Sequence, residues 1–216
     1  GVSLVRCCLR RCVGVAFGCP SMSSVKELAP GAVLGTCSLR GRAQLINRRP
    51  GLQVVEFRGN VQTRLKQLAD GVADCTFLAI AGLNRLGMSE VPATGFDTGD
   101  MLPAVAQGAI GIERREGDSR AAEMLAAIHD LETAQRLASE RAFLATLDGS
   151  CETPIAGLAE LDGTTLRLRG EVLRPDGSEA LQDAQTCVIE DGPELGREMA
   201  TKLLEQAGDG FFDWRG

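Results

Sequence analysis

The sequence predicts a domain of class α/β, with a mainly parallel or mixed sheet, followed by a small α+β domain with a three-stranded antiparallel sheet. Two observations carry this prediction: a strand-then-helix rhythm that begins at Ala32, and an alternating, hairpin-forming run near the C-terminus. With 216 residues, 44% of them hydrophobic, the chain is long enough for one large or two small cores, and we expect a soluble, globular protein.

Short β-branched runs are each followed by a turn and a helical pattern: AVLG by TCSLRGRAQLINR, LQVVEF by RGNVQTRLKQLADG, and CTFLAIAG by LNRLGM. In the second unit Val61, Leu65 and Leu68 share one helix face, which Asn60 is placed to cap and Gly71 to end. Such units predict a mainly parallel sheet, in which ligands gather beyond the carboxyl ends of the strands and helix N-termini attract anions.

The C-terminal part follows a different pattern. Residues 119–147 have helical periodicity around a break at His129 and Asp130, which predicts two helices. Residues 164–189 alternate like antiparallel strands around the turn residues 175–177, and the last helical run, PELGREMATKLLEQAG, is expected to pack on that sheet. The α+β domain should begin near Leu131. Between the two domains, MLPAVAQGAIGIE is interpreted as an apolar strand with a Gln-Gly turn.

Residues 1–29 are atypical in composition, because the apolar start is interrupted by arginines and the first acidic residue is Glu27. An Arg-rich, acid-poor start is typical of an organellar transit peptide, but a gene-model or reading-frame artefact also explains the crowded cysteines, and we favour it. These cysteines form no CxxC pair and have no histidine partner, so no metal site is expected there. They are Cys7, Cys8, Cys12 and Cys19.

A formal net charge of −6 argues against nucleic-acid binding, which needs clustered basic residues. The sequence has no conventional signal peptide and no apolar run long enough to span a bilayer, so a reducing cytoplasm is the default location, with no membrane partner. Lys26, Lys66 and Lys202 are the only lysines among 23 basic residues. Arginine grips carboxylates bidentately, although high genomic GC content would produce the same bias.

Six motifs, taken in order, resemble successive motifs of the porphobilinogen deaminase (hydroxymethylbilane synthase) family from about Pro30 to the C-terminus. They are GTCSLRGRAQL, FRGNVQTRL, LAIAGLNRLG, MLPAVAQGAIGIE, ERAFLATLDGSCETPI and VLRPDGS. The resemblance implies two α/β domains like those of periplasmic binding proteins and a third, α+β domain. It places 30–102 in domain two, 103–126 in a crossover segment of an incomplete domain one, and 131–216 in the C-terminal domain.

The resemblance also implies a transferase of tetrapyrrole (porphyrin, haem) biosynthesis. Such an enzyme condenses four molecules of porphobilinogen, with release of ammonia, onto a cysteine-linked dipyrromethane primer to give hydroxymethylbilane. The expected partner is porphobilinogen, and the expected state is a monomer in the cytoplasm, or in an organelle if residues 1–28 are a transit peptide. The alternative is a small-anion-binding α/β module without catalysis, which would need no covalent primer.

Cys151, in the GSCETPI turn, resembles the family's cofactor cysteine, whose thiolate forms a hydrolysis-resistant thioether with dipyrromethane. The other cofactor-binding residues that the resemblance implies are Ser38, Arg40, Asn60 and Arg64. Those implied for substrate carboxylates are Arg58 and Arg85. By contrast, Cys37, Cys75 and Cys187 are expected to be buried structural cysteines.

Two departures from the family pattern matter. The family has a second arginine where this chain has Gly41, with Arg42 one position later. The family's catalytic aspartate and its neighbouring lysine have no counterpart in residues 1–30, so no catalytic residue is assignable and this chain is expected to have little activity. Glu113 and Glu140 are expected to be solvated or structural rather than substitutes for that acid. With His129 as the only histidine, no metal cluster is expected.

Overall fold

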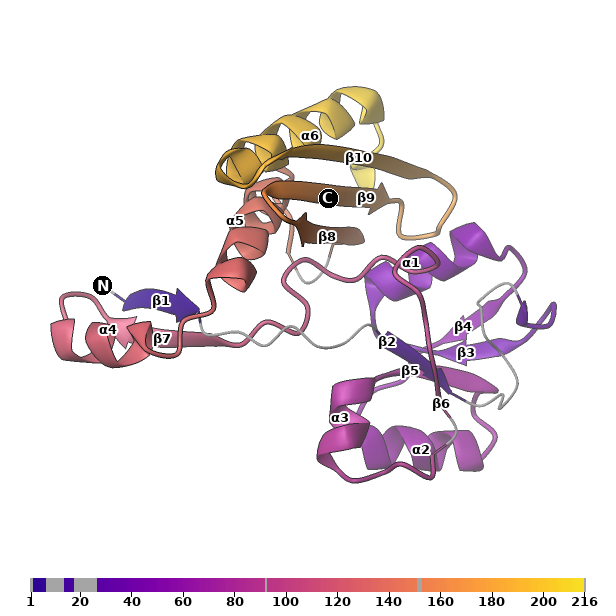
Figure 1. The fold of residues 1–216 in the computed structure, drawn as a ribbon. Helices are drawn as coiled ribbons and strands as arrows, with labels where there is room; N and C mark the ends of the chain where they lie inside the picture. The colour runs from indigo at the N-terminus through magenta and orange to yellow at the C-terminus, as the bar shows by residue number, and fades with distance from the viewer. Residues whose placement is uncertain (1, 7–13, 18–26, 92, 151–152, 216) are drawn as a thin grey trace.

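The computed structural model describes residues 2–6, 14–17, 27–91, 93–150 and 153–215. Its strands form a five-stranded mixed sheet, a three-stranded antiparallel sheet and a two-stranded antiparallel pair. The first two sheets belong to separate domains that meet at helix α1, while the pair lies to one side of both (Figure 1). The predicted fold class is therefore confirmed.

The five-stranded sheet has the order β4-β3-β5-β2-β6. Strand β3 is parallel to both β4 and β5, whereas β2 lies antiparallel between β5 and β6. The bounds are β2 Gly14–Phe17, β3 Val33–Gly35, β4 Gln53–Val55, β5 Cys75–Ala79 and β6 Ala93–Gly95.

Three helices cover this sheet: α1 (Leu39–Arg48) on one face, and α2 (Val61–Ala69) and α3 (Ile80–Arg85) on the other (Figure 1). The predicted apolar face of α2 packs around Leu78 and Leu83, as the helical spacing indicates. The predicted third strand is shorter than its apolar run, because the helix already begins at Ile80.

The cap predictions for α2 are confirmed. The Asn60 side chain accepts a hydrogen bond from the Thr63 amide at 2.9 Å, and Gly71 follows the helix with a φ of 75°. Gly35 at the end of β3 is required for another reason: a Cβ atom there would overlap the ring of the fully buried Phe57. The strand that leads to the SLR motif therefore depends on glycine for its packing.

The C-terminal domain packs two helices on one face of the sheet β10-β9-β8. Alternate residues of β9 point into this core, and those between them point to the opposite face, toward α1. The predicted hairpin is confirmed, with Gly177 at a φ of 72°. The bounds are α5 Leu131–Thr146, β8 Ile155–Asp162, β9 Thr165–Leu173, β10 Ala180–Val188 and α6 Gly192–Ala207.

The segment between the domains is only partly a strand. Residues 101–110 are irregular and turn at Val105–Gly108, and strand β7 (Gly111–Arg115) begins after them. The predicted Gln-Gly turn is present, with Gly108 at a φ of 80°. The expected strand is wrong for residues 101–110, because their backbone bonds the surrounding domains instead: the Pro103 carbonyl accepts from the Gly157 amide at 3.0 Å. Helix α4 (Ser119–Ala126) follows β7.

The N-terminal part contributes strands that its composition did not predict. Strand β1 (Val2–Arg6) pairs with β7, and β2 lies inside the five-stranded sheet. The pairing partners lie far along the chain, so local sequence carries little signal for them. Within the described residues no helix is both long and apolar enough to cross a membrane.

Candidate functional site

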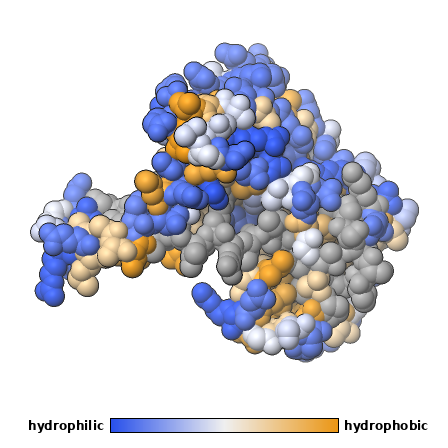
Figure 2. All heavy atoms as spheres, in the orientation of Figure 1, coloured by the Kyte–Doolittle hydropathy of each residue, from blue (hydrophilic) through white to orange (hydrophobic). Residues whose placement is uncertain are grey.

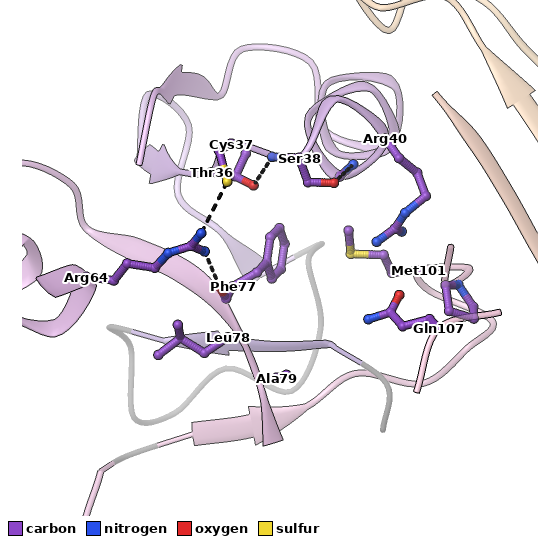
Figure 3. Close-up of a pocket in the computed structure, with 12 residues that line it drawn as sticks. Thr36, Cys37, Ser38, Arg40, Arg64, Phe77, Leu78, Ala79, Met101 and Gln107 are labelled. Atoms are coloured by element: carbon purple, nitrogen blue, oxygen red, sulfur yellow. Dashed lines mark hydrogen bonds between the residues drawn. The ribbon is translucent and has the colours of Figure 1, made fainter. Parts of the chain in front are cut away.

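A cavity of about 260 Å³ opens where β3 and β5 end and where α1 begins. This is the edge of the sheet at which parallel strands direct their carboxyl ends, as the sequence predicted. Its wall combines guanidinium, hydroxyl and thiol groups with apolar side chains (Figure 3). The lining residues are Thr36, Cys37, Ser38, Arg40, Gly41, Arg64, Phe77, Leu78, Ala79, Met101, Pro103 and Gln107.

Ser38 and Arg40 reach the cavity from the start of α1, Ser38 as the N-cap residue and Arg40 from the first turn. The Ser38 hydroxyl oxygen caps this helix by accepting from the Gly41 amide at 3.1 Å, and the Ser38 amide donates to Thr36 Oγ1 at 3.1 Å. These two bonds fix the turn after β3, so that the helix N-terminus and its free amides face the cavity.

The Arg40 guanidinium is anchored at one end and open at the other. Its Nη1 atom donates to Gln44 Oε1 at 3.1 Å and to the Leu102 carbonyl at 2.6 Å. Among the described residues its Nε and Nη2 atoms have no hydrogen-bond acceptor, and the side chain extends toward Met101 and Gln107 (Figure 3). The free donors suit an anionic oxygen in the cavity.

Burial lowers the pKa of Arg40 from 12.5 to about 10; the charge of Glu171 opposes this shift and that of Arg48 adds to it. The group is therefore still a cation at neutral pH, but one that has lost much of its hydration. Such a cation attracts a carboxylate more strongly than a solvated one does, because less water must be displaced.

Arg64 enters the cavity from the second strand-helix unit, on α2. Its Nε atom donates to the Gly59 carbonyl at 3.0 Å, Nη1 to the Phe77 carbonyl at 3.3 Å and Nη2 to the Cys37 sulfur at 3.2 Å. One N–H on each terminal nitrogen is left by these bonds. The structure thus brings Ser38, Arg40 and Arg64 together from different elements, although they are up to 26 positions apart.

Sequence reasoning missed the apolar and amide part of the wall. Phe77 and Leu78 come from β5, and Met101, Pro103 and Gln107 come from the irregular segment between the domains. The Gln107 side-chain oxygen accepts from the Ala104 amide at 3.0 Å, which leaves its NH₂ group for a ligand. The signal available in the sequence is the motif MLPAVAQG itself, whose Gln-Gly turn carries Gln107.

The three cysteines expected to be structural have different environments. Cys75 is buried at 1% exposure in the core of the α/β domain, and Cys187 packs partly exposed against the C-terminal core. Cys37 is exposed and lines the cavity beside Arg64, so the expectation of burial is wrong for this residue. It lies two residues after β3, in the turn that leads to α1.

Three other residues that the resemblance implied do not line this cavity. Asn60 uses its side chain to cap α2. Arg58 is 80% exposed and pairs with Glu56 at 2.6 Å, which raises the pKa of Arg58 through that hydrogen bond and the charge of Glu56. Arg85 is exposed at the last position of α3. Their roles stay predictions.

Cys151 lies outside the described residues. The residues around it belong to the turn between α5 and β8, where the Ser150 amide donates to Thr153 Oγ1 at 2.8 Å. Glu140 on α5 is fully buried and accepts from the amides of Ala106 at 2.8 Å and Ala159 at 2.7 Å. These bonds tie α5 to residue 106 and to β8, and Glu113 on β7 is exposed. Neither lines the cavity.

The site has the chemistry of a carboxylate-binding pocket with an apolar side. Two guanidinium groups, a helix N-terminus and an amide surround a space that Phe77, Leu78, Met101 and Pro103 also face. Among the residues that the structure describes, no group of three or more His, Cys, Asp or Glu side chains is arranged to hold a metal ion. Such a lining suits a small ligand that has both an apolar part and an anionic group.

Comparison with known families gives two matches. The model of "Porphobilinogen deaminase, dipyromethane cofactor binding domain" matches residues 2–123, and that of "Porphobilinogen deaminase, C-terminal domain" matches residues 134–205. The first match contains the whole cavity wall. It also begins well before Pro30, where the recognised motifs start, and so includes β1 and β2.

Curated relatives give the same result. The chain is 58% identical over 199 residues to a porphobilinogen deaminase of Paracoccus denitrificans, covering 92% of this chain and 64% of the relative. It is 48% identical over 203 residues to a chloroplastic porphobilinogen deaminase of Pisum sativum, covering 92% and 55% respectively. A porphobilinogen deaminase of Nitrobacter hamburgensis is 44% identical over 197 residues, covering 91% and 62%. The chain therefore spans between half and two thirds of these relatives' lengths.

Proposed function

Because the chain belongs to the porphobilinogen deaminase family, we propose that its cavity binds the carboxylate-bearing pyrroles of hydroxymethylbilane synthesis. The activity is that of a transferase, which condenses four porphobilinogen molecules onto a dipyrromethane primer in tetrapyrrole (porphyrin, haem) biosynthesis. One observation carries the proposal: Arg40 and Arg64, from two different strand-helix units, face a single cavity that also has an apolar side.

The donor set fits dipyrromethane. Each pyrrole of that cofactor bears an acetate and a propionate, so a site for it needs several cations and a surface for flat rings. Arg40 and Arg64 keep unused N–H groups, and Phe77 and Met101 offer the apolar surface. When bound, the cofactor supplies the growing end of the pyrrole chain, held by a stable thioether.

In this proposal the residues of this chain bind the pyrrole carboxylates and orient the rings. The two guanidinium groups hold carboxylates in directions set by their own anchors, Leu102 and Gln44 for Arg40, and Phe77 and Cys37 for Arg64. Fixed donors of this kind align a reacting carbon without reorganising during the reaction. Ser38 caps the N-terminus of α1, whose free backbone amides can donate hydrogen bonds to a carboxylate.

The covalent attachment point in this proposal is Cys151. Support comes from the segment that follows it: Ile155 begins β8, and the Gly157 amide of that strand bonds Pro103, which lines the cavity. The C-terminal domain is thus joined to the cavity wall a few residues after Cys151. Asn60, Arg58 and Arg85 are proposed as further contacts to cofactor or substrate carboxylates.

The domain division implied by the resemblance, 30–102, 103–126 and 131–216, is part of the proposal, and so is the absence of an assignable catalytic acid. General acid-base help is worth about 10² to 10⁴ in rate, so a polypeptide of these 216 residues alone should bind pyrroles but condense them slowly. We also propose that the protein is a monomer in the cytoplasm or an organelle and that it has no nucleic-acid or membrane partner.

The test compares this chain with a chimera in which the N-terminal portion of the Paracoccus denitrificans relative precedes it. Both are supplied with porphobilinogen, and hydroxymethylbilane and the intact protein mass are measured. The chimera should gain the dipyrromethane mass and form product, the chain alone should form little or none, and Cys151→Ser in the chimera should prevent the mass gain.

A chimera that is folded but neither gains the mass nor forms product would contradict the proposed function. The anion-binding alternative would then be favoured if the chain still bound porphobilinogen. Turnover of these 216 residues alone at an ordinary enzymatic rate would instead show that an acid within them does the work of the family's aspartate.

A further inference from the structure

A buried carboxylate joins the two domains beside the cavity without lining it. Glu171 lies on β9, on the face of the sheet opposite the C-terminal core, and is 1% exposed. Both of its oxygens accept from Arg48 Nη2 on α1, at 3.0 and 3.1 Å, and Oε1 also accepts from Gln182 Nε2 at 2.7 Å. A buried carboxylate with this many donors is held in one place.

Glu171 also fixes the orientation of the Gln44 amide. Gln44 is fully buried on α1, and its Nε2 atom donates to Glu171 Oε2 and to the Leu102 carbonyl, the latter at 3.1 Å. Both N–H groups of that amide are therefore used on acceptors. If the amide flipped, its oxygen would face the carboxylate and carbonyl oxygens, which is strongly unfavourable. The carboxylate thus leaves only one orientation for Gln44.

That orientation presents an acceptor to Arg40. With Nε2 directed at Glu171, the Gln44 Oε1 atom faces Arg40 Nη1 at 3.1 Å, and the Leu102 carbonyl takes the second N–H of the same nitrogen at 2.6 Å. In the flipped amide the Gln44 NH₂ group would face the Arg40 Nη1 donor, and neither group could accept from the other. A chain of contacts therefore runs from the C-terminal domain, through Gln44, to the guanidinium that lines the cavity.

We propose that Glu171 is a positioning residue which, acting through the Gln44 amide, holds the Arg40 guanidinium in the direction that receives a carboxylate of the bound pyrrole. The inference deepens the proposed function and rests on it for the identity of the ligand. It makes the carboxylate site of the α/β domain dependent on the docked C-terminal domain, the domain that carries Cys151.

A purely structural role for the same contact is the competing explanation, and the chain offers a matched control. Asn47 lies on the same helix and donates from Nδ2 to the Gly177 carbonyl of the C-terminal domain at 3.0 Å. The turn between β9 and β10 lies close to α1 there, since a Cβ atom on Gly177 would lie 2.9 Å from the Ala43 carbonyl oxygen. Asn47→Ala weakens the same docking without touching Gln44 or Arg40.

The experiment has two readouts on the full chain. The first is NMR of the ¹³C,¹⁵N-labelled arginine guanidinium groups, with Arg40 assigned through Arg40→Lys, which reports whether rotation about the Cζ–Nη bonds is restrained. The second is the Kd for porphobilinogen from titration calorimetry. The variants are Glu171→Leu, Glu171→Gln, Gln44→Met, the combination of Gln44→Met with Glu171→Gln, and Asn47→Ala, each checked for folding by circular dichroism.

In the wild-type chain we expect a restrained Arg40. Glu171→Leu and Gln44→Met should release it and weaken porphobilinogen binding about tenfold, the loss of one charge-assisted contact. Glu171→Gln should have a smaller effect, because its amide oxygen still accepts from Gln44 Nε2. In the Gln44→Met background Glu171→Gln should add nothing, and Asn47→Ala should change neither readout.

An Arg40 that stays restrained in the folded Gln44→Met protein would overturn the proposal, as would an Asn47→Ala variant that reproduces the effects of Gln44→Met. If Glu171→Leu does not fold, the role of Glu171 is tested by Glu171→Gln: an effect of equal size in the wild-type and Gln44→Met backgrounds would overturn the proposal. A failure of the proposed function would look different: Arg40→Leu would leave porphobilinogen affinity unchanged, while the NMR readout would still show whether Glu171 positions Arg40.

Discussion

The Nη2 atom of Arg64 lies 3.2 Å from the Cys37 sulfur, so a guanidinium and an exposed thiol share one wall of the cavity. A ligand whose carboxylate pairs with Arg64 must therefore cover Cys37. We predict that porphobilinogen slows the alkylation of Cys37 by iodoacetamide, measured by peptide mass spectrometry, and that Arg64→Leu removes this protection. Cys187, on β10 of the other domain, is the control. Equal alkylation of Cys37 with and without porphobilinogen would contradict the assigned cavity.

Much of this site could be predicted from the sequence because its parts are local. Ser38 and Asn60 are helix N-caps that follow short strands. Each accepts from the amide three positions later, a local pattern that the sequence itself contains. The resemblance implied Arg40 and Arg64; both lie in the first turns of helices that follow parallel strands, and that topology brings such positions to one edge.

The remainder depends on contacts that local sequence does not encode. Strand β2 pairs with β5 some 60 positions later in the chain, so composition alone set it apart as atypical. Gln44 and Glu171 are 127 positions apart and look like ordinary polar residues until the domains meet. Gln107 lies in an apolar motif whose backbone is irregular over residues 101–110, and hydrophobic periodicity does not predict where such a backbone directs its side chains.

Gly41 provides a gain-of-function test. A Cβ atom there would lie 3.3 Å from Ser38 Oγ and 3.4 Å from Met101 Cε, so these side chains must move by a few tenths of an ångström to accept it. Gly41→Arg restores the arginine that the family pattern has at this place, and we expect it to strengthen porphobilinogen binding by about tenfold. Gly41→Ala is the control for replacing a helical glycine without adding a charge. It should stabilise the fold by about 0.5–1 kcal/mol and leave the affinity for porphobilinogen unchanged. No gain of affinity over Gly41→Ala would show that a side chain here does not reach the ligand.

Glu140 should be important for stability rather than for chemistry. Its carboxylate receives the buried amides of Ala106 and Ala159, which belong to the segment between the domains and to β8. Glu140→Ala leaves these donors without an acceptor, so we expect the free energy of unfolding, measured in urea, to fall by about 2–4 kcal/mol. Glu179→Gln, at an exposed pair with Arg174, should cost less than about 1 kcal/mol. Similar costs for both variants would argue against this role of Glu140.

Asp130 gives the N-cap of α5 a pH dependence. Hydrogen bonds from the Thr133 side chain and amide lower the pKa of this carboxyl group below its ordinary value. A group with a lowered pKa stabilises the fold above its unfolded-state pKa, about 4, and this contribution is lost as the pH falls through the folded-state pKa. Asp130→Ala should therefore lower Tm at pH 7, with the difference from wild type shrinking in acid. A constant Tm difference down to low pH would indicate that the charge of Asp130 does not matter.

The central claim is that Arg40 binds a carboxylate of porphobilinogen inside the cavity. Titration calorimetry of porphobilinogen into the wild-type chain, Arg40→Leu and Arg197→Leu tests it most directly, because Arg197 forms an exposed pair with Glu194 on α6, in the other domain. We expect Arg40→Leu to weaken binding about ten- to one hundredfold, the cost of losing a charge-assisted pair, and Arg197→Leu to bind like the wild type. A folded Arg40→Leu protein that binds porphobilinogen as tightly as the wild type would contradict the account.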